Sequence, residues 1–333
     1  SSAGPAVRTV LVGLLPDVSL KSARRLAESS YLTILETVSL VDRRRPEQQM
    51  DAILKARPDV VIVAGGTDGG ASSAVLSLAE VVGLACFRLP QEPRVRLLFT
   101  GNSALKDRIN ELLGNLALVS AAPNVRPELA HEALDGPRAE LAQILQELRA
   151  SQIGGLRDLA HYAGGSLLPT AQAEGQVIRF LSKIAGSANG ILSVNVGSAA
   201  TSIAAAFSGE LFLTVAPDLG VGVNAANTLA EAPSDQFTRW VPAPLTAADV
   251  RAFGLERSLH PHTLPVEVDD LHREQALARQ ALRGALRRAQ AHWPKTLPGT
   301  RGDLLPHFDL IIGGGAALSH APSPGAAALM LLD

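Results

Sequence analysis

The pattern of hydrophobic and polar positions changes about half-way along the chain. In the first half, short apolar runs bounded by glycine, proline or charged residues alternate with segments whose apolar residues recur at helical spacing. Such runs are typical of strands buried on both faces of a parallel sheet. They predict strands at residues 7–15, 32–40, 59–64, 84–89, 95–100 and 116–121. The intervening segments predict helices near residues 19–29, 46–56, 71–82, 103–113 and 137–153.

This alternation predicts an α/β fold, with a doubly wound parallel-sheet domain over residues 1–153. In such a sheet, ligands bind outside the carboxyl ends of the strands. Three of those ends carry glycine or small polar residues, at residues 13–17, 65–70 and 101–103. We expect all three to lie on one edge of the sheet.

The AGGTDGG loop is the most distinctive of these ends and is a candidate ligand site. It contributes Gly65, Gly66, Thr67, Asp68, Gly69 and Gly70, and Gly101 and Asn102 belong to the next strand end. The loop matches neither the dinucleotide GxGxxG pattern nor the P-loop. A tight turn in which Asp68 caps the following helix explains the same residues, as does a plain N-cap at Asn102 or Ser103. Both interpretations remain open.

The second half has a different order of elements. A glycine-punctuated segment near residues 151–165 marks the boundary, so we expect a second domain over residues 154–333. The pattern predicts a helix at residues 171–186 and strands at residues 191–196, 203–207 and 211–215, with residues 197–202 joining the first two strands as a hairpin. A helix at residues 271–293 has one apolar stripe and a basic remainder, which predicts a packed helix with a solvated basic face or with a face for an acidic partner.

Composition and charge exclude several classes of function. The chain has 333 residues, a net charge of -2 and 4% aromatic residues, which argues against binding to nucleic acid. A lone cysteine, Cys86, lies in an apolar run and predicts a small core residue in a reducing compartment. No run is long enough to span a membrane, so we expect a cytoplasmic protein. The chain begins without methionine and stops within an apolar helical pattern, which predicts a domain of a longer protein.

A resemblance to a known family adds to these predictions. The ordered segments VGLLPDVSLKSARRLAE, PDVVIVAGGTDGG, LLFTGNSALKD, LSVNVGSAATS, APDLGVGVNA and DLIIGGGAALSHAPSPGAAALMLLD resemble the MutL family of glutamate mutase accessory proteins, which is unrelated to the mismatch-repair protein of that name. The resemblance implies an actin-like, ribonuclease H-like ATPase half-domain at residues 154–333. That superfamily also contains sugar kinases and the large heat-shock chaperones.

The resemblance also implies a function and a set of site residues. The family is presumed to reactivate adenosylcobalamin-dependent mutases in a chaperone-like way, with ATP or ADP and magnesium that are not tightly bound. By this resemblance, phosphate would contact Asn195, Gly197, Ser198 and Thr201, and adenosine would contact Gly313, Gly314 and Gly315. The partner would be such a mutase or the rest of a longer chain.

The hairpin departs from the family pattern at its acidic positions. The family sequence is similar to VDVGGATTD, whereas this chain has Asn195 and Ser202 at the two acidic positions. An amide neither carries the charge that magnesium prefers nor accepts a proton as a carboxylate does. In addition, no Asp-x-Gly-Ser/Thr segment precedes Val7. We therefore predict no catalytic residue and no metal site, and a degenerate or partial family member. A non-catalytic scaffold that keeps the ATPase fold is the alternative function.

Overall fold

The computed structural model describes residues 4–90, 92–165, 167–186, 189–294 and 305–332. The chain forms two compact units, one that ends at Pro169 and one that begins at Thr170. Helix α6 (Leu156–Tyr162) therefore belongs with the first unit, and the division lies beyond the boundary at residues 153 and 154 that the glycine pattern predicts. Each unit has its own sheet and its own apolar core, and each is described separately below.

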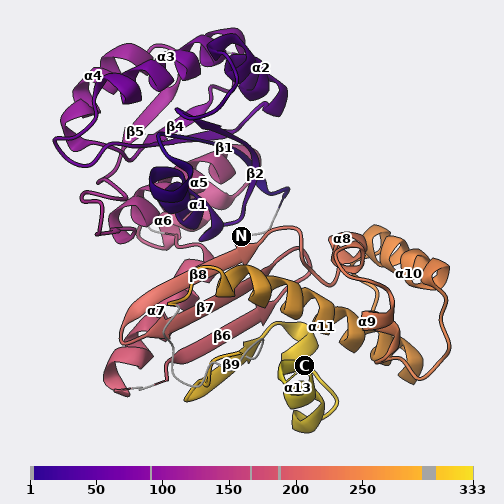
Figure 1. Ribbon diagram of the computed structural model, residues 1–333. Coiled ribbons are helices and arrows are strands. Elements are labelled where there is room, and N and C mark those ends of the chain that lie inside the picture. The colour runs from indigo at the N-terminus through magenta and orange to yellow at the C-terminus, as the bar shows by residue number, and fades with distance from the viewer. Residues whose placement is uncertain (1–3, 91, 166, 187–188, 295–304, 333) are drawn as a thin grey trace. The chain divides into compact units, whose positions relative to one another are not determined.

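The first unit is built on a five-stranded sheet in which every neighbouring pair is parallel (Figure 1). Its strands are β1 (Val7–Gly13), β2 (Leu32–Ser39), β3 (Val60–Ala64), β4 (Arg96–Phe99) and β5 (Leu118–Ala121). The strand order β2-β1-β3-β4-β5 confirms the doubly wound α/β domain. The chain leaves β1 in one direction to form β2 and later returns on the other side to form β3. The switch point of the sheet therefore lies between β1 and β3.

Helices cover both faces of this sheet, because successive residues of the central strands point to opposite sides. Val10 and Val12 of β1 pack with one apolar cluster, and Leu11 between them packs with the other. The helices are α1 (Lys21–Glu28), α2 (Pro46–Ala56), α3 (Ser73–Arg88), α4 (Lys106–Leu113) and α5 (Asp135–Gln152), with short helical turns at Pro16–Leu20 and Ser103–Leu105. Residues of α2, α3 and α4 join the first cluster, and residues of α1 and α5 join the second.

The strand expected at residues 84–89 is wrong, because these residues form the last turns of α3. Ala85 and Cys86 are buried, whereas Leu84 and Phe87 are exposed, which is the spacing of a helix. A short apolar run does not distinguish a buried strand from one face of a buried helix. Cys86 is a core residue as expected, and burial raises the pKa of its thiol to about 11.

The second unit contains a four-stranded sheet in the order β8-β7-β6-β9. Strands β6 (Ile191–Val196), β7 (Thr201–Phe207) and β8 (Glu210–Ala216) are antiparallel neighbours, and β9 (Leu310–Gly314) pairs in parallel with β6. The antiparallel hairpin confirms the expected kind of connection, but Thr201 and Ser202 belong to β7, so the hairpin loop is residues 197–200. This mixed sheet after a parallel one agrees with the predicted fold class.

Two long helices pack on opposite faces of the second sheet (Figure 1). Helix α7 (Thr170–Ile184) places Ile178 against one face, and helix α11 (Val268–Gln290) places Ala278 and Leu282 against the other. The remaining helices are α8 (Ala225–Ala230), α9 (Asp235–Thr238), α10 (Ala247–Leu259), α12 (Ala316–Ser319) and α13 (Pro324–Leu331). Helices α8, α9 and α10 form a smaller apolar cluster with α11.

The basic side of α11 is mostly covered rather than solvated. Arg279 is buried, with its guanidinium carbon 4.1 Å from the centre of the Trp240 ring. Arg288 forms salt bridges with Asp218 and Glu231, both of which precede α9 in the chain. Arginine suits such positions because its planar guanidinium stacks on rings and binds carboxylates bidentately. The charges on this helix therefore hold the second unit together.

Candidate functional site

The three predicted strand ends of the first unit lie at the carboxyl edge of its sheet, as expected, because β1, β3 and β4 are parallel. Residues after β1 and after β3 line one pocket of about 220 Å³, which lies at the switch point between these strands. The lining residues are Leu14, Leu15, Val18, Ser19, Gly65, Gly66, Thr67, Ala71, Asn124, Val125, Arg126 and Leu129. Ligands of doubly wound sheets bind at this point. The pocket is therefore one candidate ligand site.

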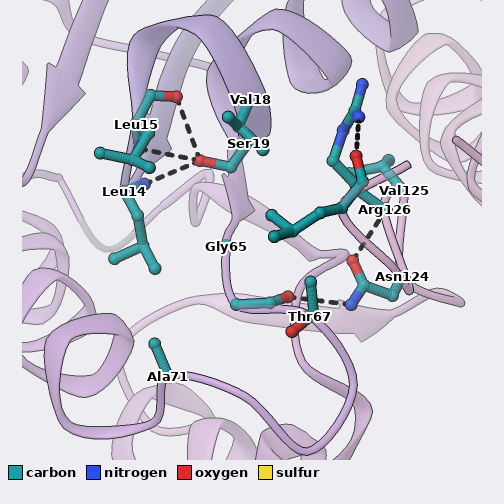
Figure 2. A pocket seen from close by; sticks show the side chains of 12 residues that line it. Leu14, Leu15, Val18, Ser19, Gly65, Thr67, Ala71, Asn124, Val125 and Arg126 are labelled. Atoms are coloured by element: carbon teal, nitrogen blue, oxygen red, sulfur yellow. Dashed lines mark hydrogen bonds between the residues drawn. The ribbon is translucent and has the colours of Figure 1, made fainter. Parts of the chain in front are cut away.

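The polar side chains of this pocket are largely used by the protein itself. Ser19 accepts hydrogen bonds from the amides of Leu14 and Leu15 through its Oγ. The guanidinium of Arg126 donates to Ser22 and to the carbonyl of Leu129, and Figure 2 shows it pointing away from Thr67. Among the lining side chains, the leucines, the valines and the single hydroxyl of Thr67 remain to contact a ligand. The pocket therefore suits an apolar group more than a phosphate.

Asn102 holds the Gly65–Gly70 loop in place from the neighbouring strand end. Its side chain accepts from the amide of Gly69 at 3.2 Å and donates to the carbonyl of Gly70 at 3.2 Å. It also accepts from the amide of Ala104, so the predicted N-cap is confirmed. Gly101 permits this approach, since a Cβ there would lie 2.5 Å from the carbonyl oxygen of Gly65. The predicted loop residues are thus brought together as one hydrogen-bonded structure.

Asp68 caps a different helix from the one that the sequence suggests. Its Oδ1 accepts from the amide of Ser103 at 2.9 Å, and Ser103 begins the helical turn that leads into α4. Asn124 donates to the same oxygen at 3.0 Å and to the carbonyl of Gly66 at 3.0 Å. The hydrogen bonds from Asn124 and from Ser103 lower the pKa of Asp68. The prediction that Asp68 caps the helix after its own loop is wrong, because the loop turns it toward the next strand end.

The second candidate site lies at the carboxyl edge of the sheet in the second unit. Because β6 and β9 are parallel, the hairpin that follows β6 and the glycine turn that follows β9 leave the sheet on the same edge. Asn195 pairs with Gly314, and a Cβ at Gly314 would lie 3.4 Å from the Asn195 side chain. Gly315 has φ of 89°, and a Cβ there would lie 2.0 Å from the carbonyl oxygen of Val196. The structure therefore brings together the residues predicted to contact phosphate and adenosine.

The hairpin loop has unpaired backbone donors but few available hydroxyls. The amides of Ser198, Ala199 and Ala200 have no hydrogen-bond partner within the part of the chain that the structure describes. The Ser198 hydroxyl accepts from the amide of Val223. The predicted phosphate contact of the Thr201 hydroxyl does not fit, because this group is buried and donates to the carbonyl of Leu219 at 3.0 Å. Thr201 therefore positions the loop, and the three amides are the donors that the described part of the chain does not itself use.

The two positions that lack the family's acidic residues face a carboxylate from another element. Asn195 and Ser202 are direct cross-strand partners, and both reach Oε2 of Glu174 on α7. The distances are 3.5 Å from Asn195 Nδ2 and 3.2 Å from Ser202 Oγ. Ser193 donates its hydroxyl to Oε1 of the same carboxylate. A negative charge therefore lies beside the hairpin, although not on its strands.

Sequence analysis misses Glu174 and Asn124 because each belongs to an element distant in the sequence. Glu174 lies four residues before the buried Ile178 of α7, so it is on the face of the helix that packs on the sheet. A carboxylate on the buried side of an amphipathic helix is the feature of the sequence that would have indicated Glu174. Among the described residues, no group of three or more acidic, histidine or cysteine side chains could hold a metal ion. The helices described are all too short or too polar to cross a lipid bilayer.

Comparison with known proteins identifies the family. The model of the MutL protein family matches residues 1–333. The chain belongs to the MutL family. A curated MutL relative, Protein MutL of Clostridium tetanomorphum, is 22% identical over 350 residues, which cover 98% of this chain and 73% of the relative. The resemblance stated from the sequence motifs is therefore confirmed.

A solved structure with some similarity to this MutL chain is a nucleotide-free acetone carboxylase, from work on ATP-dependent acetone carboxylation. The sequence identity is 9% and the TM-score is 0.26, and the match covers 87% of this chain. The chain spans about half of that structure, with 53% covered. At this level of similarity the comparison carries no argument about fold or function.

Proposed function

We propose that this chain is a nucleotide-binding accessory factor for an adenosylcobalamin-dependent mutase, and that it binds nucleotide without efficient hydrolysis. Membership of the MutL family supports the accessory role, because the sequence resembles the glutamate mutase accessory proteins. The observation that carries the nucleotide part is the convergence of the β6 hairpin and the β9 glycine turn at one edge. The mutase is then the expected partner.

The residues at this edge fit a nucleotide. The amides of Ser198, Ala199 and Ala200 supply donors for phosphate oxygens. Gly313 and Gly314 end β9 without positive φ, and the missing side chain of Gly314 leaves space on the side of the sheet that carries Asn195, whereas Gly313 faces Leu318. Gly315 allows the turn to approach the hairpin closely. When bound, magnesium nucleotide would supply the phosphate charge to which these groups respond.

Binding rather than turnover follows from the hairpin residues. Asn195 neither accepts a proton nor carries charge, and Ser202 is equally neutral. The carboxylate of Glu174 accepts hydrogen bonds from three side chains, so most of its acceptor sites are already used by the protein. We therefore expect slow hydrolysis at this site.

The test is calorimetric titration of the chain with ADP and ATP in the presence of magnesium, together with thermal unfolding. A nucleotide at about 100 times its dissociation constant adds about 2.7 kcal/mol, which raises the midpoint by roughly 5–10 °C. Gly314→Leu places a side chain where adenosine is expected and should abolish the shift. Gly325→Leu, an exposed glycine on α13, is the matched control and should keep it. No shift with either nucleotide would exclude nucleotide binding by this chain.

A protein-interaction scaffold is the second candidate, and one observation favours it. The hairpin loop is attached to the following segment, because the amides of Val221 and Gly222 donate to the carbonyls of Gly197 and Ser198. Asn224 reinforces this contact through hydrogen bonds to Ala199 and Pro217. A loop held by these hydrogen bonds offers a rigid surface for a protein partner. Copurification of the chain with a mutase in the absence of any nucleotide, combined with no thermal shift, would favour the scaffold.

A further inference from the structure

The carboxylate of Glu174 lies in an unusual electrostatic setting. It accepts hydrogen bonds from Ser193, Ser202 and Asn195, all of which are uncharged. Within the described residues, it has no salt bridge with lysine, arginine or histidine. A part-buried carboxylate without a cation is costly unless its hydrogen bonds and the surrounding water offset the lost solvation. Its negative charge is therefore held in place and left without a positive partner.

Helix α7 and strands β6 and β7 together fix the position of Glu174. It lies near the start of α7, on the face that packs on the sheet. The three donors are on β6 and β7, on the side of the sheet that also faces Ile178. Asn195 is two residues before the hairpin loop, and Ser202 is two residues after it. The carboxylate of Glu174 therefore contacts one residue on each side of the loop that carries the amides left unpaired within the described residues.

The lone pair of Glu174 that accepts no hydrogen bond from the described part of the protein suits a water molecule of a hydrated cation. An ionised carboxylate has about four lone-pair sites, and three of those on Glu174 are used by the strands. Glu174 is only partly buried, so water reaches it. Magnesium keeps several waters and is commonly held by one or two carboxylates together with the phosphates of a nucleotide. A single fixed carboxylate near a phosphate-binding loop meets that requirement.

We propose that Glu174 receives the hydrated magnesium ion of a magnesium–nucleotide complex at the hairpin edge. This chain thus carries on a helix the charge that the family hairpin carries on its strands, and Asn195 and Ser202 serve as donors that position this charge. Two further aspartates at those positions would place three carboxylates side by side. The neutral residues Asn195 and Ser202 therefore donate hydrogen bonds to Glu174 and add no further negative charge, and in this way they support the binding of magnesium. The inference rests on the proposed nucleotide site.

The experiment compares the affinity of ADP with and without magnesium, measured by calorimetric titration of the whole chain. We expect the unaltered chain to bind magnesium ADP about tenfold more tightly than ADP in the presence of a chelator. Glu174→Gln should remove this preference while leaving the affinity for ADP alone nearly unchanged, because glutamine keeps an acceptor for Ser193. Glu210→Gln, on β8 of the same sheet, makes the same change of charge and should keep the preference.

A charge relocation gives the decisive control. Combining Glu174→Gln with Asn195→Asp returns one carboxylate to the hairpin strand, and the preference for magnesium should return with it. Circular dichroism of each variant verifies that the second unit is folded. If Glu174→Gln retains the preference, or if the double variant fails to recover it while folded, the inference is overturned and the nucleotide site stands. If the unaltered chain binds neither ADP nor magnesium ADP, the proposed function fails and the inference fails with it.

Discussion

The carboxyl edges of the two sheets both combine a glycine-rich loop with a fixed carboxylate, but they obtain that carboxylate from different places. In the first unit, Asp68 belongs to the loop itself, and its charge is satisfied by the amide of Ser103 and by Asn124. In the second unit, the loop is neutral and Glu174 comes from a helix. The first arrangement stabilises the loop, whereas the second leaves a charge beside free amides. The comparison shows that a glycine-rich motif alone does not identify a ligand site.

The largest expected effect comes from the glycine that closes the second edge. Gly315→Ala places a Cβ 2.0 Å from the carbonyl oxygen of Val196 and forces a side chain into positive φ. We expect a loss of about 3 kcal/mol in the free energy of unfolding. Chemical denaturation measures it. Gly325→Ala, whose Cβ would meet only the Ser323 hydroxyl at 3.7 Å, is the control and should change stability little.

The second unit also contains a carboxylate that does have a cation beside it, Glu274 with Arg257, and this pair makes the stability of the chain depend on pH. Burial raises the pKa of Glu274 to about 7, although Arg257 at 2.8 Å acts in the opposite direction. Because this folded-state pKa exceeds the unfolded value of about 4.3, the contribution of Glu274 to stability is complete below about pH 4.3 and is lost as the pH rises through about 7. The loss is about 3 kcal/mol.

Denaturation at about pH 5 and at about pH 8 measures this dependence. Glu274→Gln should lack it, because glutamine does not titrate. Glu256→Gln, an exposed position on α10, should show the same pH dependence as the unaltered chain. An unchanged slope in Glu274→Gln would assign the dependence to another group.

The loop of the first unit depends on Asn102, and its removal tests the stabilising role of that edge. Asn102→Ala removes three side-chain hydrogen bonds, to Gly69, Gly70 and Ala104, at a fully buried position. We expect a loss of about 2 kcal/mol, because the freed groups are left partly unsatisfied. Asn110→Ala, on the exposed side of α4, serves as the control. Equal stabilities of the two variants would show that the loop holds its shape without this side chain.

The smallest effect concerns the neutral hairpin of the second unit. Asn195→Asp places a second carboxylate beside Glu174 and should destabilise the chain by about 1 kcal/mol. Adding Glu174→Gln should restore the stability, because one charge then remains. Thermal unfolding of the single and double variants measures the coupling. Additive losses would show that the two side chains do not interact.

The sequence predicts the regular elements well where local signals agree. Helix α2 begins at Pro46 and ends at Ala56, as the pattern predicts, because proline is favoured at the first helical position. Strand β6 also has its predicted bounds, since Gly190 and Gly197 enclose a mostly apolar run, ILSVNV, in which the polar residues alternate with valine. The pattern fails in the last turns of α3, where the apolar run around Cys86 fits a strand and a buried helix equally well.

The sequence by itself determined the family, the parallel sheet of the first unit and the glycine turns that lie at the two edges. These features depend on local periodicity, on glycine and on ordered motifs. Only the tertiary structure decided which polar groups are already used and which remain available. Asp68 finds its partners after β4 and β5, and Glu174 meets its donors across the sheet. Such pairings depend on how strands and helices pack, because they join residues that are far apart in the chain.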